Sequence, residues 1–190
     1  EERQLIQNTY LKELSIPVVF IRDANPSEDT VVFNNDEGTR ALVFHLARKH
    51  DVKEVIYVGG PEDVGFHKAI QESFERALER CNVALREKVY HTNGWTDDFG
   101  TIADEMIQAG LPDAVICSSE LSAASLIQQL SHRGVRIPDD VIVTSYRFNE
   151  PRATHHYNIT SVLRLPEMMS INAARKLIGK LQGYDMGEVN

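Results

Sequence analysis

Short apolar stretches alternate with amphipathic segments along most of the chain. The stretches with the length and composition of buried strands are IPVVFI (16–21), EVIYVG (54–59), KVYH (88–91), DAVICS (113–118), DVIVTS (140–145) and ITSVL (159–163). Apolar side chains recur at helical spacing over residues 37–49, 67–80, 98–108, 119–133 and 166–181. Strands that alternate with helices of this length are typical of βαβ units. The pattern therefore predicts an α/β fold with mostly parallel sheet covered by helices on both faces.

Glycine and proline punctuate this pattern at the expected places. Gly110, Gly134 and Gly183 follow predicted helix ends, where a left-handed residue commonly stops a helix. Pro112 and Pro138 stand just before predicted strands. Both signals support the predicted boundaries of the elements.

Composition and charge narrow the class of protein. The 190 residues are 42% hydrophobic and 25% charged, which suits one large globular domain or two small lobes. The formal net charge of −8, without a basic cluster, indicates that these residues alone do not bind DNA. No apolar run approaches the roughly 20 residues of a membrane span, and the N-terminus has no features of a signal peptide. Cys81 and Cys117 fall within a predicted helix and strand, so we interpret both as reduced core residues of a cytoplasmic protein.

Motifs for catalysis are not visible in the sequence. The turn Gly59-Gly60-Pro61 lacks the third glycine of a dinucleotide-binding loop, and no P-loop or nucleophile elbow occurs. The acid pairs 97–98 and 139–140 suit a helix start and a turn. The adjacent His155 and His156 have no third ligand at zinc-like spacing. We expect neither an enzyme nor a cofactor or metal.

The order of the motifs resembles the effector-binding domain of LacI/GalR-type transcription regulators. VVFNNDEGTRALVFHLARKHDVKEVIYVGGPE (31–62) looks like the family's passage from its first lobe into its second, with Asn34 in place of the first Asp of a D-N-x-x-G element. GLPDAVICSSELSAASLIQQLSHRGVRIPDDVIVTSY (110–146) resembles the family's strand, helix and I-P-D-D-V segment. NITSVLRLPEMMSINAARKLIGKLQG (158–183) resembles its last strand and helix.

The resemblance implies a periplasmic-binding-protein-like fold of two Rossmann-like lobes. We assign 34–149 to a nearly complete second lobe, and 1–33 with 150–190 to a partial first lobe and the crossover segments. The chain looks truncated at its front, so the family's DNA-reading helix-turn-helix would lie outside it. The implied function is a homodimeric sensor in which a small sugar-like or anionic effector changes the relative orientation of the lobes.

Ligands of such sheets settle beyond the carboxyl ends of the strands, which directs attention to the loops at 59–67, 91–98, 118–122 and 145–150. Trp95, the single tryptophan, lies in one of these loops, where the family has an aromatic residue lining the pocket. Its alternative role is to plug the edge of the lobe. His67 lies where a loop enters a helix and is a further candidate contact, although a solvated histidine fits the same position.

The remaining candidate positions depart from the family pattern. Ile70 replaces an arginine, and Ser119 and Glu120 stand for an Asn-Asp pair. Tyr146 and Arg147 lie where the family has G-F-D-D, so a cation replaces an acceptor carboxylate. Such a pocket suits an anionic or more apolar ligand better than an ordinary sugar.

Three alternatives remain open. The chain could be the sensor of a diguanylate-cyclase-type signalling protein, or a degenerate module that only dimerises. A Rossmann-like enzyme acting on nucleotides is disfavoured because no phosphate-cradling loop is present.

Overall fold

The computed structural model describes residues 16–22, 30–61, 64–85, 89–93, 99–148 and 157–184. The chain divides into two compact units. The smaller unit combines Glu1–Phe33 with Pro166–Asn190, and the larger unit comprises Asn34–Leu165.

A parallel sheet forms the centre of the larger unit. Its strands are β3 (Glu54–Gly59), β4 (Ala84–Leu85), β5 (Tyr90–His91), β6 (Ala114–Cys117), β7 (Ile142–Phe148) and β8 (Thr160–Arg164). Among the described residues they run in the order β4-β3-β6-β7-β8, with β5 also pairing with β3, and every pairing is parallel. The predicted α/β class with a parallel sheet is confirmed.

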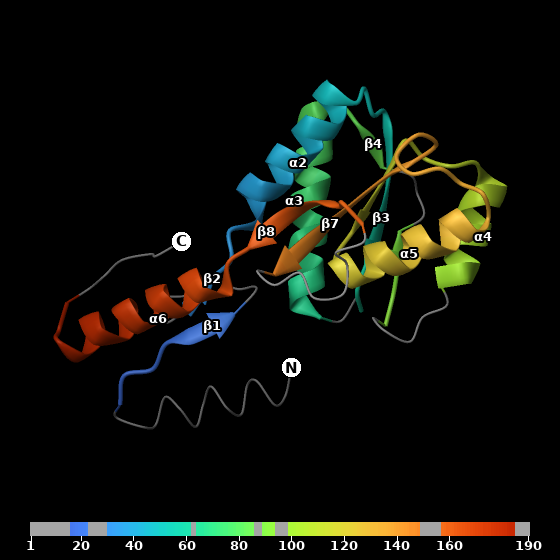
Figure 1. Cartoon of the computed structure of the whole chain (residues 1–190). Coiled ribbons are helices and arrows are strands. Elements are labelled where there is room, and N and C mark those ends of the chain that lie inside the picture. The colour runs from blue at the N-terminus through green and yellow to red at the C-terminus, as the bar shows by residue number, and fades with distance from the viewer. Residues whose placement is uncertain are drawn as a thin grey trace. The chain divides into compact units, whose positions relative to one another are not determined.

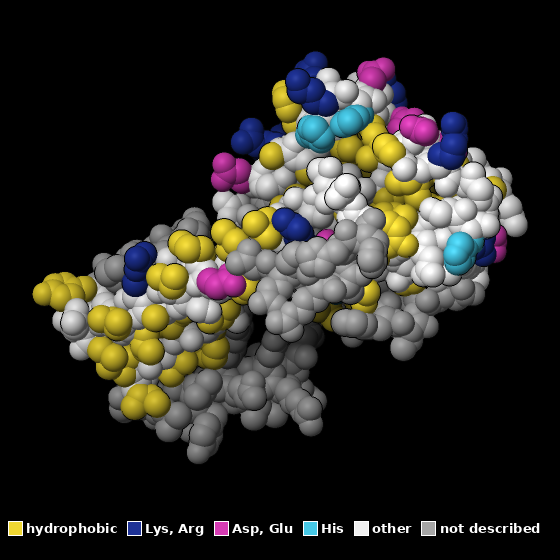
Figure 2. All heavy atoms as spheres, in the orientation of Figure 1, with side chains coloured by type: hydrophobic (Ala, Val, Ile, Leu, Met, Phe, Trp, Pro, Cys, Tyr) yellow, Lys and Arg dark blue, Asp and Glu magenta, His cyan; other side chains and the backbone are white. Residues whose placement is uncertain are grey.

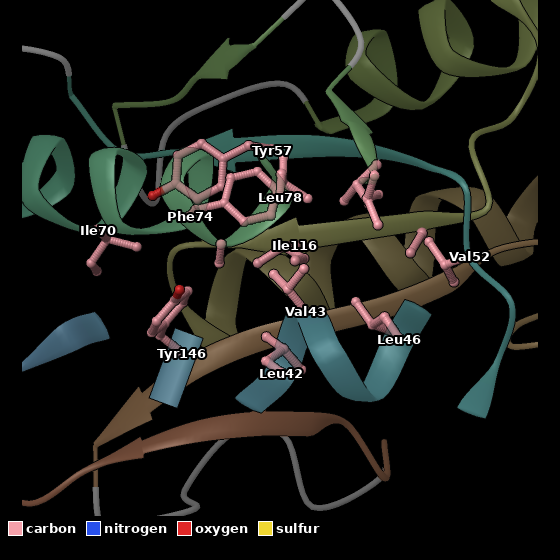
Figure 3. Close-up of a cluster of buried hydrophobic side chains, with 14 residues drawn as sticks. Leu42, Val43, Leu46, Val52, Tyr57, Ile70, Phe74, Leu78, Ile116 and Tyr146 are labelled. Carbon is pink, nitrogen blue, oxygen red and sulfur yellow. The ribbon is translucent and has the colours of Figure 1, made fainter. Parts of the chain in front are cut away.

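Helices cover both faces of this sheet (Figure 1). The helices α2 (Asn35–Lys49) and α3 (Gly65–Cys81) lie on one face, and α4 (Phe99–Ala109) and α5 (Glu120–His132) lie on the other. Alternate residues of each strand supply two separate cores: Val55 and Tyr57 pack toward α2 and α3, whereas Ile56 and Val58 pack toward α4 and α5. The first of these cores is drawn in Figure 3.

Local sequence sets the ends of the helices. The Asn34 side chain accepts a hydrogen bond from the amide of Asp36 at 3.1 Å and caps α2. Gly134 has a φ of +82°, which favours glycine directly after α5. Asn82 ends α3 in the same left-handed region with a φ of 55°, a conformation that asparagine tolerates better than most residues.

The smaller unit pairs two short parallel strands with one helix. Its elements are β1 (Phe20–Arg22), β2 (Thr30–Val32) and α6 (Pro166–Leu181). Val31, Met169 and Ala173 form its small core. The sequence pattern predicts α6 with its observed bounds but does not predict β2, whose last two residues fall in the stretch 31–62 interpreted as the passage between the lobes.

The larger unit extends beyond the predicted lobe boundary at residue 149. Strand β8 pairs with β7 from Thr144↔Thr160 to Phe148↔Arg164, so it completes the larger sheet. The boundary predicted from the sequence instead places this segment with the partial first lobe and the crossover segments.

Two further expectations from the sequence concern the state of the cysteines and the possibility of a membrane span. Cys117 is buried in β6, Cys81 is half-buried at the end of α3, and both thiols are free. None of the helices in the described ranges has the length and apolarity needed to cross a membrane.

Candidate functional site

The carboxyl ends of four strands meet along one edge of the larger sheet. The register places Gly59 beside His91, Val58 beside Cys117, and Cys117 beside Ser145. The residues that follow these positions therefore lie in a row at the edge where ligands of parallel sheets bind. Because α3 and α5 each follow a strand of this row, their N-termini lie at the same edge.

Ser119 and Glu120 form the start of α5 at this edge. The Ser119 hydroxyl accepts a hydrogen bond from the amide of Ser122 at 3.1 Å and lies 2.8 Å from the Ser122 hydroxyl. Glu120 is the first residue of the helix and is half-buried. A capped helix N-terminus of this kind offers partial positive charge to an anion, while the Glu120 carboxylate offers an acceptor to hydroxyl groups.

Arg147 lies close to the end of β7, on the face of the sheet that α5 covers. Strand alternation turns its side chain away from that of Tyr146, toward the side shared by Ser145 and Ser161, whose hydroxyls are 2.7 Å apart. The side chain is half-buried, and in the part of the chain that the structure describes its buried Nε has no hydrogen-bond partner. A buried guanidinium N–H without a hydrogen-bond acceptor is energetically unfavourable, so a ligand that supplies an acceptor would be stabilised here.

Two histidines contact the loop after β3. A Cβ atom placed on Gly60 would lie 2.1 Å from Nε2 of His67, so the imidazole rests directly against the glycine backbone. His91 Nδ1 lies 3.4 Å from the Gly60 carbonyl oxygen. The Thr92 hydroxyl donates to the Gly59 carbonyl at 2.9 Å. His91 and Thr92 fall within the predicted ligand-facing loop at 91–98 but were not among the candidate contact residues, and strand register identifies them.

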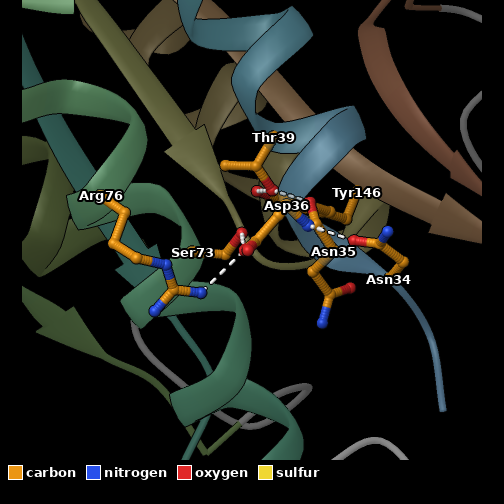
Figure 4. Close-up of polar contacts among 7 residues, drawn as sticks. All are labelled: Asn34, Asn35, Asp36, Thr39, Ser73, Arg76 and Tyr146. Atoms are coloured by element: carbon orange, nitrogen blue, oxygen red, sulfur yellow. Dashed lines mark hydrogen bonds and ion pairs between the residues drawn. The ribbon is translucent and has the colours of Figure 1, made fainter. Parts of the chain in front are cut away.

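A polar network links α2 to α3 (Figure 4). The Asp36 carboxylate accepts hydrogen bonds from the Ser73 hydroxyl at 2.5 Å and from Arg76 Nη2 at 2.7 Å. The Ser73 hydrogen bond, followed by that of Arg76, lowers the pKa of Asp36 below its ordinary value. The Ser73 hydroxyl thus links the start of α2 to the middle of α3.

Comparison with known proteins agrees with this architecture. A family model described as a periplasmic binding protein-like domain matches residues 43–188. The chain belongs to this family. The resemblance to LacI/GalR-type regulators predicted from the sequence is also confirmed, because curated relatives and similar solved structures are regulators of that type.

Two curated relatives illustrate the extent of the match. The repressor PurR of Vibrio vulnificus is 27% identical over 157 residues, covering 76% of this chain and 46% of PurR. The repressor CytR of Escherichia coli is 20% identical over 193 residues, covering 98% of this chain and 53% of CytR. The chain thus spans about half the length of these relatives.

Two solved structures share the fold. The lac repressor dimer bound to operator and an anti-inducer is 18% identical, with a TM-score of 0.78 over 95% of this chain and 64% of the repressor. A sugar-binding LacI-family regulator from Escherichia coli complexed with phosphate is 20% identical, with a TM-score of 0.77 over 95% of this chain and 66% of that regulator.

In the structure of this periplasmic binding protein-like chain, the seven predicted site residues fall into three groups. Ser119, Glu120, Arg147 and His67 lie along the carboxyl edge of the sheet. Ile70 and Tyr146 do not reach the surface of the larger unit, being 0% and 2% exposed in its core. Trp95 lies outside the described residues.

The positions of Ile70 and Tyr146 have a clear physical reason. The isoleucine at position 70 of α3 stabilises the folded state by packing among Tyr57, Phe74 and other apolar side chains (Figure 3). The Tyr146 ring lies in the same core, with its hydroxyl 2.7 Å from that of Thr39. Burial raises the pKa of Tyr146, so its hydroxyl stays neutral. Neither residue is therefore retained in the candidate site.

Proposed function

We propose that this chain is the effector-sensing part of a LacI/GalR-type transcription regulator. Its function is ligand binding without chemical turnover, and its location is the cytoplasm. A bound effector changes the relative orientation of two lobes, and a homodimer transmits this change to a DNA-reading domain outside the chain. Membership in the periplasmic binding protein-like family and the names of the relatives, which are transcriptional repressors, support this proposal.

The observation that carries the ligand assignment is the half-buried Arg147 guanidinium at the carboxyl edge. Its Nε lacks a partner among the described residues, and the capped N-terminus of α5 begins after β6, the strand next to β7. A cation and a helix N-terminus on neighbouring strand ends favour a ligand with a carboxylate or phosphate group. Glu120 adds an acceptor for hydroxyl groups, so a sugar-like acid or sugar phosphate fits this set of residues.

A thermal-shift screen of the intact protein against sugars, sugar phosphates, nucleosides and small carboxylates tests the proposal. We expect an acidic ligand to raise the melting temperature by a few degrees in the parent protein but not in Arg147→Ala. Trp95→Ala tests the predicted stacking contact. Arg136→Ala is the matched control, because this arginine lies before β7, at the opposite end of the strand, and pairs with Asp140.

A degenerate module that only dimerises is the second candidate. The burial of Ile70 favours this candidate. The resemblance implies a ligand-binding arginine at this position, and here the position holds a core isoleucine. Failure of every ligand class to stabilise the intact protein, together with a concentration-dependent dimer, would favour this alternative over a sensor.

A further inference from the structure

The larger unit has a depression at the amino-terminal end of β7 and β8. It encloses about 440 Å³ between the C-terminal halves of α2 and α5. Strand β8 first pairs at Thr144↔Thr160, so Ile142 and Val143 extend past the start of β8 and form one wall. Figure 2 shows histidine side chains beside hydrophobic surface on this unit. Parallel strands place this end opposite the carboxyl edge that carries Arg147.

His45 and His50 form one side of this depression. Their Nε2 atoms are 3.2 Å apart, and the rings meet edge to face with an interplanar angle of 70°. Two imidazole nitrogens bound to one tetrahedral zinc ion at 2.0–2.1 Å would be about 3.3 Å apart. The pair is joined by an N–H···N hydrogen bond whose nitrogen separation is close to that of two metal ligands, so an ion would replace the shared proton without a large movement of the rings.

Charges of both signs lie around the pair. His50 is the C-cap of α2, where the helix dipole places partial negative charge, and the basic Arg48 and Lys49 lie in the same last turn. No lysine, arginine, aspartate or glutamate lines the depression among the described residues. The nearby Asp51 is paired with Lys53.

We propose that His45 and His50 form a binding site for a divalent first-row transition-metal ion. Two imidazole nitrogens suit copper, nickel and zinc, and copper is expected to bind most tightly. Within the described ranges no group of three His, Cys, Asp or Glu side chains lies together. The remaining coordination positions are thus available to water or to oxygen atoms in the depression, which Ser131, Asn158 and Thr160 also line.

Titration of the full chain with Cu²⁺ under electron paramagnetic resonance tests the site directly. We expect one ion per chain with hyperfine structure from two nitrogens, and displacement by excess Ni²⁺ or Zn²⁺. His45→Gln and His50→Gln should each weaken binding by roughly tenfold or more and leave a one-nitrogen signature. Thermal melting in the presence of a chelator establishes that both variants remain folded.

One control separates this site from another described histidine. His132→Gln removes a histidine at the C-terminal end of α5 that does not line the depression. This control should bind Cu²⁺ like the parent chain. Unchanged affinity in His45→Gln and His50→Gln, or loss of the two-nitrogen spectrum in the control, would overturn the proposal and leave the pair as a hydrogen bond at the end of α2. Neither result depends on the effector proposed for the carboxyl edge.

Discussion

The hydroxyl groups of Thr39 and Tyr146 lie 2.7 Å apart in the interior and join α2 to β7. The Thr39 hydroxyl also lies 2.6 Å from the Asn35 carbonyl, to which it donates. The Tyr146 hydroxyl can therefore donate to Thr39, which accepts from one side and donates to the other. Two elements separated by about a hundred positions in the sequence are thus tied by a fully buried polar contact.

Removing the Tyr146 hydroxyl should lower the free energy of unfolding less than removing the Thr39 hydroxyl. Tyr146→Phe leaves Thr39 bonded to Asn35, so we expect a loss of about 0.5–1.5 kcal/mol in the free energy of unfolding. Thr39→Val leaves the buried Tyr146 hydroxyl without this partner and should cost about 1–3 kcal/mol. Urea denaturation of both variants and of the double variant measures the coupling. Additive effects would contradict a direct contact.

Protonation of Asp36 should weaken the link between α2 and α3 in acid. Its pKa is lowered in the folded state by the hydrogen bonds from Ser73 and Arg76, so the stabilising contribution is present above the ordinary value of 3.8. The contribution is lost as pH falls from there through the folded-state pKa. The stability difference between the parent and Asp36→Asn should therefore be largest near neutral pH and shrink below pH 3.8, as measured by urea denaturation at several pH values. Because Asp36 is largely exposed, the difference should stay below about 1 kcal/mol. Ser73→Ala should reduce the same pH dependence.

Gly38 marks a close approach between α2 and β8. A Cβ atom at this position would lie 2.6 Å from Cγ1 of Val162, a side chain with restricted rotamers. We expect Gly38→Ala to cost about 1–3 kcal/mol from overpacking, reduced by up to about 1 kcal/mol from the better helix propensity of alanine. Thermal or urea unfolding measures this loss.

The matched test of that contact is Val162→Ala. This substitution removes the clashing methyl groups, so it should be less costly in the Gly38→Ala background than in the parent protein. Equal costs in both backgrounds would show that Gly38 tolerates a side chain without contact to Val162.

The two thiols should differ in reactivity. Cys117 is fully buried, and burial raises the pKa of its thiol, whereas Cys81 is partly exposed at the end of α3. We expect iodoacetamide to modify Cys81 in the folded protein and Cys117 only after denaturation, as measured by mass spectrometry of digested samples. Rapid modification of Cys117 under native conditions would contradict its position in β6.

Much of the element order was predictable because local spacing reports which face of a segment is buried. The stretch EVIYVG gave the bounds of β3, and the helical spacing over 166–181 gave those of α6. Glycine positions marked helix ends, since only local backbone conformation is involved there. The family resemblance followed from the order of such segments and was confirmed by comparison. Strands β2 and β4 were not predicted, because a strand of two or three residues is too short to show a periodic pattern. Such strands are defined only by their neighbours in the sheet.

The sequence by itself determined the alternation of strands and helices, the family, and the placement of Ser119, Glu120 and Arg147 near strand ends. Only the tertiary structure decided that Tyr146 faces Thr39 in the core, that Ser73 bonds to Asp36, and that β8 belongs to the larger sheet. These outcomes depend on how far each helix rotates and on which strand edges meet. Such choices are set by packing between residues distant in the sequence, and no local pattern of polar and apolar positions specifies them.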